Sequence, residues 1–123
     1  MSDRKLLELA AKAAGLTINA KAQAERDAAM DPEAASLWLS DGTTAWNPRT
    51  NNGDALWLAV TLGIIVGAYS KERFARVSWL QRPHDGDPKG VTSMLVEPVN
   101  GDPLAATRRA IVRAAAAIGE KMP

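Results

Sequence analysis

The chain contains no cysteine among its 123 residues, which excludes disulfide bonds, thiolate nucleophiles and metal sites built on cysteine. Histidine is also scarce, because His84 is the only one. Fifteen basic and fourteen acidic side chains leave a formal net charge of +1. No global electrostatic field therefore attracts nucleic acid or an anionic membrane, and binding to either would have to be local.

Long apolar runs are absent as well. The uncharged run from Ala55 to Ser70 is shorter than the roughly 20 residues needed to span a bilayer, and Gly63 and Gly67 interrupt it. The first five residues lead into an amphipathic pattern rather than the apolar core of a secretory signal. We therefore expect a cytoplasmic protein without a targeting segment or membrane contact, folded as a single domain over residues 1–123.

The most apolar segment, residues 51–63, predicts the helix around which the rest of the fold is arranged. Asn51 can cap its first turn, Asp54 suits the positive end of the helix, and Gly63 can adopt the left-handed conformation that ends it. This helix is apolar on most of its circumference. We therefore expect it to be covered on more than one side.

Several elements are expected in the first half of the chain. Ser2 and Gly15 bracket an amphipathic helix. Residues 16–20 alternate like a short strand and lead into a mobile or partly helical connection, which Asp31-Pro32 ends. Residues 37–46 predict a hairpin that turns at Asp41-Gly42, with Trp38 facing Ala45 and Leu37 facing Trp46.

The second half predicts three further strands and a closing helix. Residues 64–69 read as a strand buried on both faces, and strands are also expected over 74–80 and 91–97, with a turn at 70–73 and a loop at 81–90. Asp102-Pro103 should begin the last helix and Gly119 should end it. The expected fold class is α+β, with helices packed on a mostly antiparallel sheet of three to five strands.

Three segments are similar to a known family: LLELAAKAAG at 6–15, WNPRTNNGDAL at 46–56 and DPLAATRRAIVR at 102–113. Together they resemble the phage ABA sandwich domain, found in small uncharacterised phage and prophage proteins. The resemblance implies a fold and a phage setting, and it brings no catalytic residues. The chain departs from that pattern at Trp57 and Thr61, where relatives often carry basic residues, which makes one face of the central helix unusually apolar.

Groups able to carry chemistry are few. His84, Asp85 and Asp87 could bring three ligand atoms together, but a zinc site would require another strong ligand and a hard cation more oxygen atoms. We interpret them as a solvated loop and expect no metal and no cofactor. Neither a nucleophile elbow nor a phosphate-binding glycine loop is present. An enzyme is therefore the less favoured class, although the sequence leaves the question open.

Basic residues give a weak signal for nucleic acid. Arg108, Arg109 and Arg113 could form a stripe on the last helix, and Arg73, Arg76 and Arg82 could add charge from the sheet. The alternative is that the stripe is the solvent face of an amphipathic helix, and we favour that alternative. Nucleic acid is therefore an unlikely partner.

Four tryptophans are many for a chain of this size, and tryptophan is common among interface anchors. We expect Trp38 and Trp79 in the core, whereas Trp46 fits either the core or the surface. Trp57 lies to one side of the expected buried face, so it is either exposed or covered by a sheet. If it is exposed beside Ile64, the apolar patch predicts a homodimer.

The candidate partner-binding residues crowd the turn before the central helix: Trp46, Asn47, Arg49, Asn51 and Asn52, together with Trp57. Aromatic and arginine anchors here could contact a partner, and exposed amides at a helix start could bind an anion. Alternatively, the asparagines only cap the helix and Trp46 lies beneath it. We expect a non-enzymatic phage accessory protein that binds a host macromolecule, for example to inhibit a defence or metabolic component. The alternative is a nucleotide sponge or hydrolase that uses the same turn.

Overall fold

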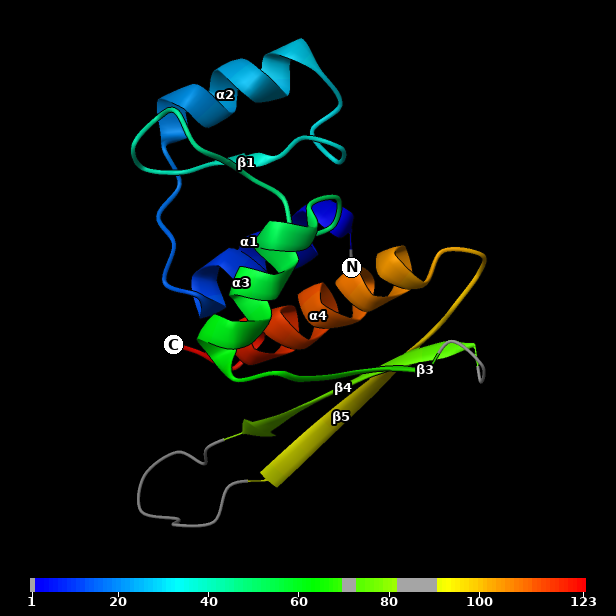
Figure 1. Cartoon of the computed structure of the whole chain (residues 1–123). Coiled ribbons are helices and arrows are strands. Elements are labelled where there is room, and N and C mark those ends of the chain that lie inside the picture. The colour runs from blue at the N-terminus through cyan, green and yellow to red at the C-terminus, as the bar shows by residue number, and fades with distance from the viewer. Residues whose placement is uncertain (1, 70–72, 82–90) are drawn as a thin grey trace.

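Helix α4 (Pro103–Glu120) lies between helix α1 and a three-stranded sheet, and its position organises the fold (Figure 1). The computed structural model describes residues 2–69, 73–81 and 91–123. Most of the circumference of α4 is buried, and the buried residues are Ala106, Ala110, Ile111, Val112, Ala114, Ala115, Ala116 and Gly119. Small side chains dominate this set, which lets neighbouring elements approach α4 closely. The fold is α+β, as predicted.

The predicted first helix is confirmed as α1 (Asp3–Ala13). The hydroxyl of Ser2 accepts a hydrogen bond from the backbone N–H of Lys5 at 3.1 Å, which satisfies one of the free donors of the first turn. Gly15 follows the helix with a φ of 74°, in the left-handed region that glycine adopts without a steric penalty. Leu7, Ala10 and Ala11 face the core.

The next segment is more regular than predicted, because residues 20–29 form a complete helix, α2 (Ala20–Ala29), where a mobile or partly helical connection was expected. The side-chain oxygen of Asn19 accepts from the backbone N–H of Ala22 at 3.0 Å and starts the helix there. The expected strand over 16–20 is wrong, since only Ile18 makes an isolated antiparallel bridge, to Leu39. The helix ends before Asp31-Pro32, as predicted.

Polar contacts fasten α2 to the rest of the molecule. Arg4 of α1 donates to both carboxylate oxygens of Asp27, at 2.9 and 3.0 Å. This guanidinium, together with the Gln23 amide, lowers the pKa of Asp27. The amide of Gln23 is buried, and its oxygen accepts from the backbone N–H of Trp38 at 2.7 Å. Helix α2 is therefore held mainly by directed polar contacts, because Gln23 is its only buried residue.

The predicted hairpin is confirmed, with β1 (Leu37–Trp38) and β2 (Ala45–Trp46) antiparallel. Leu37 pairs with Trp46 and Trp38 with Ala45, which is the predicted register. Asp41 closes the turn by accepting from the backbone N–H groups of Thr43 and Thr44, at 2.9 and 2.8 Å, and from the Thr44 hydroxyl. These bonds, the Thr44 hydroxyl first, lower the pKa of Asp41 to about 2.

The larger sheet has the strand order β3-β4-β5, with β3 (Ile65–Tyr69), β4 (Phe74–Gln81) and β5 (Val91–Pro98) antiparallel. These three predicted strands are confirmed. Ala75, Val77 and Trp79 alternate along β4 and are buried on the side of α4. The expectation that the first of these strands is buried on both faces is wrong, because Ile65 stays 69% exposed. Helices cover only one face of this sheet among the described residues (Figure 1).

Helix α3 (Asn52–Leu62) has the predicted bounds and caps, but it is not the buried centre of the fold. Only Ala55, Leu58 and Ala59 are buried, on the sides that meet α4 and the core. Within the described part of the chain, nothing covers its outer face. The hydrophobicity of α3 therefore predicted more burial than this helix has. The helix that its neighbours cover on most sides is the alanine-rich α4.

Some predictions fall on residues that the structure leaves undescribed. These are most of the turn at 70–73, Arg82, and the loop that carries His84, Asp85 and Asp87. In the described ranges, no helix combines the length and apolar character needed to cross a bilayer.

Candidate protein-binding surface

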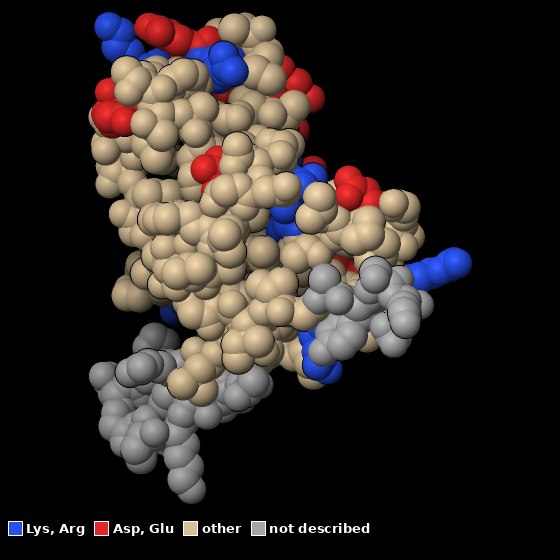
Figure 2. All heavy atoms as spheres, in the orientation of Figure 1, with Lys and Arg blue, Asp and Glu red and all other residues tan. Residues whose placement is uncertain are grey.

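The outer face of α3 is apolar and open to solvent. The side-chain oxygen of Asn51 accepts from the backbone N–H of Asp54 at 2.9 Å, and Gly63 ends the helix with a φ of 67°, so both ends are fixed. Between them, Leu56, Trp57 and Val60 are between 44% and 72% exposed. Figure 2 shows this side of the molecule as a broad uncharged expanse, with charged side chains mostly at its upper and right-hand edges.

A groove runs along one side of this face, between α3 and α4. It encloses about 280 Å³. Its apolar lining comes from α3, β3 and α4, and consists of Ala55, Leu56, Ala59, Val66, Leu104 and Ile111. Leu56 and Leu104 are both more than half exposed, so the walls of the groove are themselves accessible apolar surface.

The polar groups at the rim of the groove are engaged within the chain. Arg108 donates through Nε to the backbone carbonyl of Arg49 and through Nη1 to the side-chain oxygen of Asn52, each at 2.7 Å. The hydroxyl of Thr107 donates to the carbonyl of Pro103 at 2.8 Å. An occupant would therefore meet apolar walls, which suits an aliphatic or aromatic side chain better than a charged substrate.

Trp57 projects from α3 about 100° around the helix from Leu56, on the side away from the groove. It is 44% exposed. Of the two positions that the sequence allowed for Trp57, exposed or covered by a sheet, the exposed one is therefore correct. The expected neighbour in the patch is wrong, however, because Ile64 lies after the helix and is buried. The apolar neighbours of Trp57 on the exposed face are instead Leu56 and Val60.

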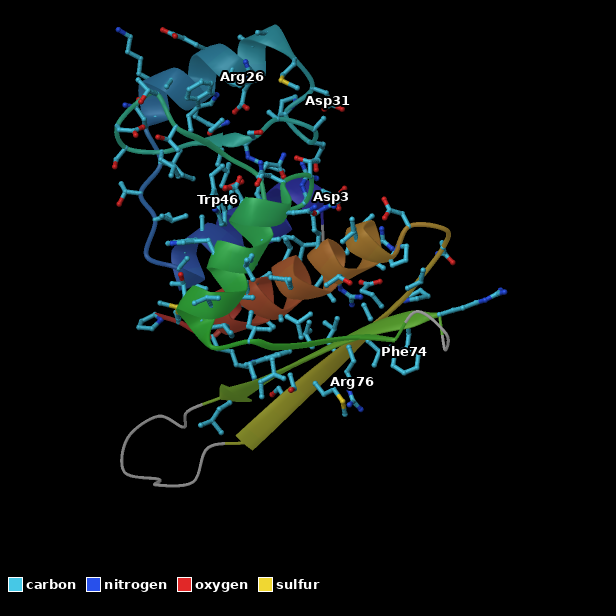
Figure 3. The ribbon with its side chains drawn as sticks, viewed as in Figure 1. Asp3, Arg26, Asp31, Trp46, Phe74 and Arg76 are labelled. Atoms are coloured by element: carbon cyan, nitrogen blue, oxygen red, sulfur yellow. The ribbon has the colours of Figure 1, made fainter. Side chains whose placement is uncertain are left out.

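Most side chains of the turn before α3 make contacts within the fold. Trp46 is only 3% exposed, because its strand pairing with Leu37 directs the ring into the core, and it lies beside the start of α3 in Figure 3. Asn47 is buried as well. Its backbone N–H donates to the Asp54 carboxylate at 2.9 Å. Of the two alternatives for this turn, the structure places Trp46 and Asn47 beneath the surface and gives Asn51 a capping contact.

Arg49 is held by two other segments. Its Nη2 donates to the backbone carbonyl of Glu33 at 2.9 Å, and its Nη1 lies 3.3 Å from a carboxylate oxygen of Asp3. The side chain is 16% exposed. Arg49 thus joins α1 to the segment that follows α2, while Asn52, although exposed, is engaged by Arg108.

The three arginines of α4 do not form one stripe. Arg108 faces α3, as described above, whereas Arg109 donates to the carbonyl of Pro98 at 3.4 Å. Arg113 forms a close ion pair with Glu97 of β5. Because each guanidinium has a partner within the chain, phosphate binding would have to compete with these contacts.

A second hollow, of about 500 Å³, lies beside the turn and is lined in part by Asp3, Asp31, Glu33, Arg49 and Arg109. Three carboxylates against two guanidinium groups make it a poor site for an anionic nucleotide. In the described residues, no group of three or more His, Asp or Glu side chains could hold a metal ion. Neither hollow provides the convergent acid, base and nucleophile that catalysis requires.

Comparison with protein-family models, with curated proteins and with solved structures finds no match. The sequence pointed to Trp57 but missed Leu56, Val60 and Leu104, because hydrophobic residues on a helix are ordinarily assigned to the core. The sequence signal that could have indicated this exposed apolar surface is the uncharged stretch, which continues past the end of α3.

Proposed function

We propose that this chain is a non-enzymatic phage or prophage accessory protein that binds a host protein through α3 and the adjoining groove. The observation that carries the proposal is the exposure of Leu56, Trp57 and Val60 beside an apolar groove. Contiguous exposed apolar surface of this kind is uncommon on monomers and typical of interaction sites. The phage setting depends on the resemblance of the three sequence segments.

The shape of the groove favours a helical segment of the partner. A groove between two helices can take apolar side chains that recur at helical spacing on one face of an inserted helix. Leu56 and Leu104 would form the walls, and the buried Ile111 lies at the floor. At about 280 Å³, the groove has room for one or two such side chains. Trp57, on the far side of the exposed face, lies outside this contact.

The competing function is a nucleotide sponge or hydrolase. It would need polar groups that converge on a phosphate or base, and the polar groups at the groove are engaged in internal hydrogen bonds. The hollow beside Arg49 is larger but carries three carboxylates. Binding of a protein therefore has the stronger support.

An affinity capture from host lysate tests the proposal. The tagged chain is compared with Leu56→Lys and Val60→Lys, which place a charge on the exposed face without disturbing the core. Met30→Lys is the matched control, since Met30 is also exposed and apolar but lies at the end of α2. We expect one or a few host proteins to be retained by the wild type and the control and lost with both α3 variants.

Turnover assays with a nucleotide library complete the test. If no captured protein depends on Leu56 or Val60, and the purified chain hydrolyses a nucleotide, then the proposal is wrong and the enzyme is supported. If capture depends on the α3 face and no turnover occurs, the binding function stands.

We also propose that the chain forms a homodimer through Trp57. The ring and the neighbouring Val60 are exposed on one side of a short helix, and a two-fold contact would bury the same residues on both copies. The groove lies on the other side of the exposed face, so such a dimer would leave it open to a partner.

A further inference from the structure

The outer edge of β5 is an open strand edge. β5 pairs with β4 on one side, and among the described residues no strand pairs with it on the other. Its eight residues match those of β4 one to one, from Val91 opposite Gln81 to Pro98 opposite Phe74, without a bulge. An unpaired edge of this length is a template for another strand unless the protein blocks it.

The ladder between β4 and β5 determines which backbone groups of β5 point outward. One residue beyond the last pair, the N–H of Val99 donates to the carbonyl of Arg73 at 2.7 Å. Hydrogen-bonded and non-hydrogen-bonded pairs alternate along an antiparallel ladder, so the odd-numbered residues of β5 bond to β4. Met94 and Val96 therefore direct their backbone N–H and C=O groups away from β4, towards the open edge.

The features that ordinarily protect an edge strand occur only at the end of β5. Proteins block such edges with charged side chains, proline or bulges. Pro98 has no N–H, and its carbonyl accepts from Arg109 at 3.4 Å. Glu97 is buried and forms an ion pair with Arg113. Residues 91–96 contain neither a charge nor a proline, so no such feature protects them.

The size of this edge favours a strand of another protein over a second copy of the chain. β5 is eight residues long, which corresponds to about 27 Å, and a sheet with its side chains is about 10 Å thick. Two copies that met edge to edge would share on the order of 300 Å² each, whereas a stable dimer needs about 800 Å² per partner. An extended segment needs less area, because backbone hydrogen bonds supply affinity and the rest of its protein can bind elsewhere.

We propose that the open edge of β5 binds an extended, uncharged segment of another protein, which adds a fourth strand to the sheet. Backbone groups of the segment would bond to those of Met94 and Val96. These two residues are 61% and 50% exposed, so apolar side chains of the segment would pack beside them. The groove borders β3, at the opposite edge of the sheet, and the inference is therefore independent of the proposed function.

Two synthetic peptides test the inference. Each has eight residues, the length of β5, with valine and threonine in alternation and a labelled glycine-serine tail. In the second peptide, methyl groups on the two central backbone nitrogens remove one donor from each edge and block close approach. Fluorescence anisotropy measures binding to the full chain. We expect the unmethylated peptide to bind about tenfold more tightly than the methylated one.

Variants of the chain locate the contact. Met94→Pro removes the outward N–H and leaves the ladder with β4 intact, because proline is tolerated where the N–H of an edge strand faces solvent. It should weaken binding of the unmethylated peptide about tenfold. Met94→Thr is the matched control, since it changes the same side chain but keeps the N–H, and it should weaken binding by no more than about threefold. Trp57→Lys is the control for α3 and should not change the binding.

Three outcomes would overturn the inference. The first is that the two peptides bind equally, and the second is that neither binds at millimolar concentration. The third is that Trp57→Lys still sediments as a dimer and that adding Met94→Pro dissociates it, which would assign the edge to a second copy. Loss of binding in Trp57→Lys would place the peptide on α3, and would count against the open edge without affecting the proposed function. Circular dichroism checks that each variant folds, and the comparison of the two peptides decides the question even if Met94→Pro does not.

Discussion

A Cβ atom placed on Gly119 would lie 2.1 Å from the backbone carbonyl oxygen of Leu9, so α4 and α1 meet backbone to backbone at this point. Gly119 lies inside α4 and is buried. The prediction that it ends the last helix is therefore wrong. Its function in the fold is to allow this close approach between the two helices.

Gly119→Ala should destabilise the fold strongly. The methyl group cannot be accommodated without moving one helix, and overpacking of this kind costs about 3 kcal/mol. Urea unfolding followed by circular dichroism measures the change in the free energy of unfolding. Gly53→Ala is the control, because a Cβ there would lie 3.2 Å from only the side chain of Asn51, and a change within about 1 kcal/mol is expected. Equal stabilities for the two variants would contradict the tight contact.

The sequence predicted the elements whose determinants are local. The caps at Ser2 and Asn51, the left-handed glycine at Gly63 and the Asp41-Gly42 turn depend on hydrogen bonds or backbone angles within a few residues, and all are confirmed. Where those signals were weak, as at Asn19, the sequence predicted only a mobile or partly helical connection in place of α2.

The faces that stay exposed could not be predicted in the same way. Burial depends on which elements meet in space, and the pattern of α3 gave no indication that only one side would be covered. For Trp46 and Trp57, spacing along the chain was compatible with either location. Tertiary packing places the first in the core and the second at the surface.

The carboxylate of Asp41 should titrate with a pKa of about 2. Because this pKa lies below the ordinary value of about 3.9, the contribution of Asp41 to stability is present above that value and is lost as the pH falls through about 2. Carbon-detected NMR of the side-chain carboxyl measures it. Thr44→Val removes the hydroxyl donor and should raise the pKa toward the ordinary value. An unchanged pKa in that variant would assign the shift to the backbone donors of Thr43 and Thr44.

The buried Trp46 and the half-exposed Trp57 should respond differently to truncation. Trp46→Ala removes a buried ring and should lower the free energy of unfolding by about 3–5 kcal/mol. Trp57→Ala removes a half-exposed ring and should cost at most about 1 kcal/mol in the monomer. Thermal and urea unfolding at low protein concentration compare them. A large loss of stability in Trp57→Ala would show that this ring is structural.

Sedimentation at micromolar concentration should show a dimer of the wild-type chain. The expected contact is isologous, so the Trp57 ring of each copy packs against the same region of the other copy. Both rings therefore become buried. Trp57→Lys places a charge in that contact and should give a monomer with an unchanged circular dichroism spectrum. Met30→Lys introduces the same charge at the end of α2 and should stay dimeric. A wild-type chain that sediments as a monomer throughout would refute the dimer, and Trp57 would then belong to the surface that binds a different protein.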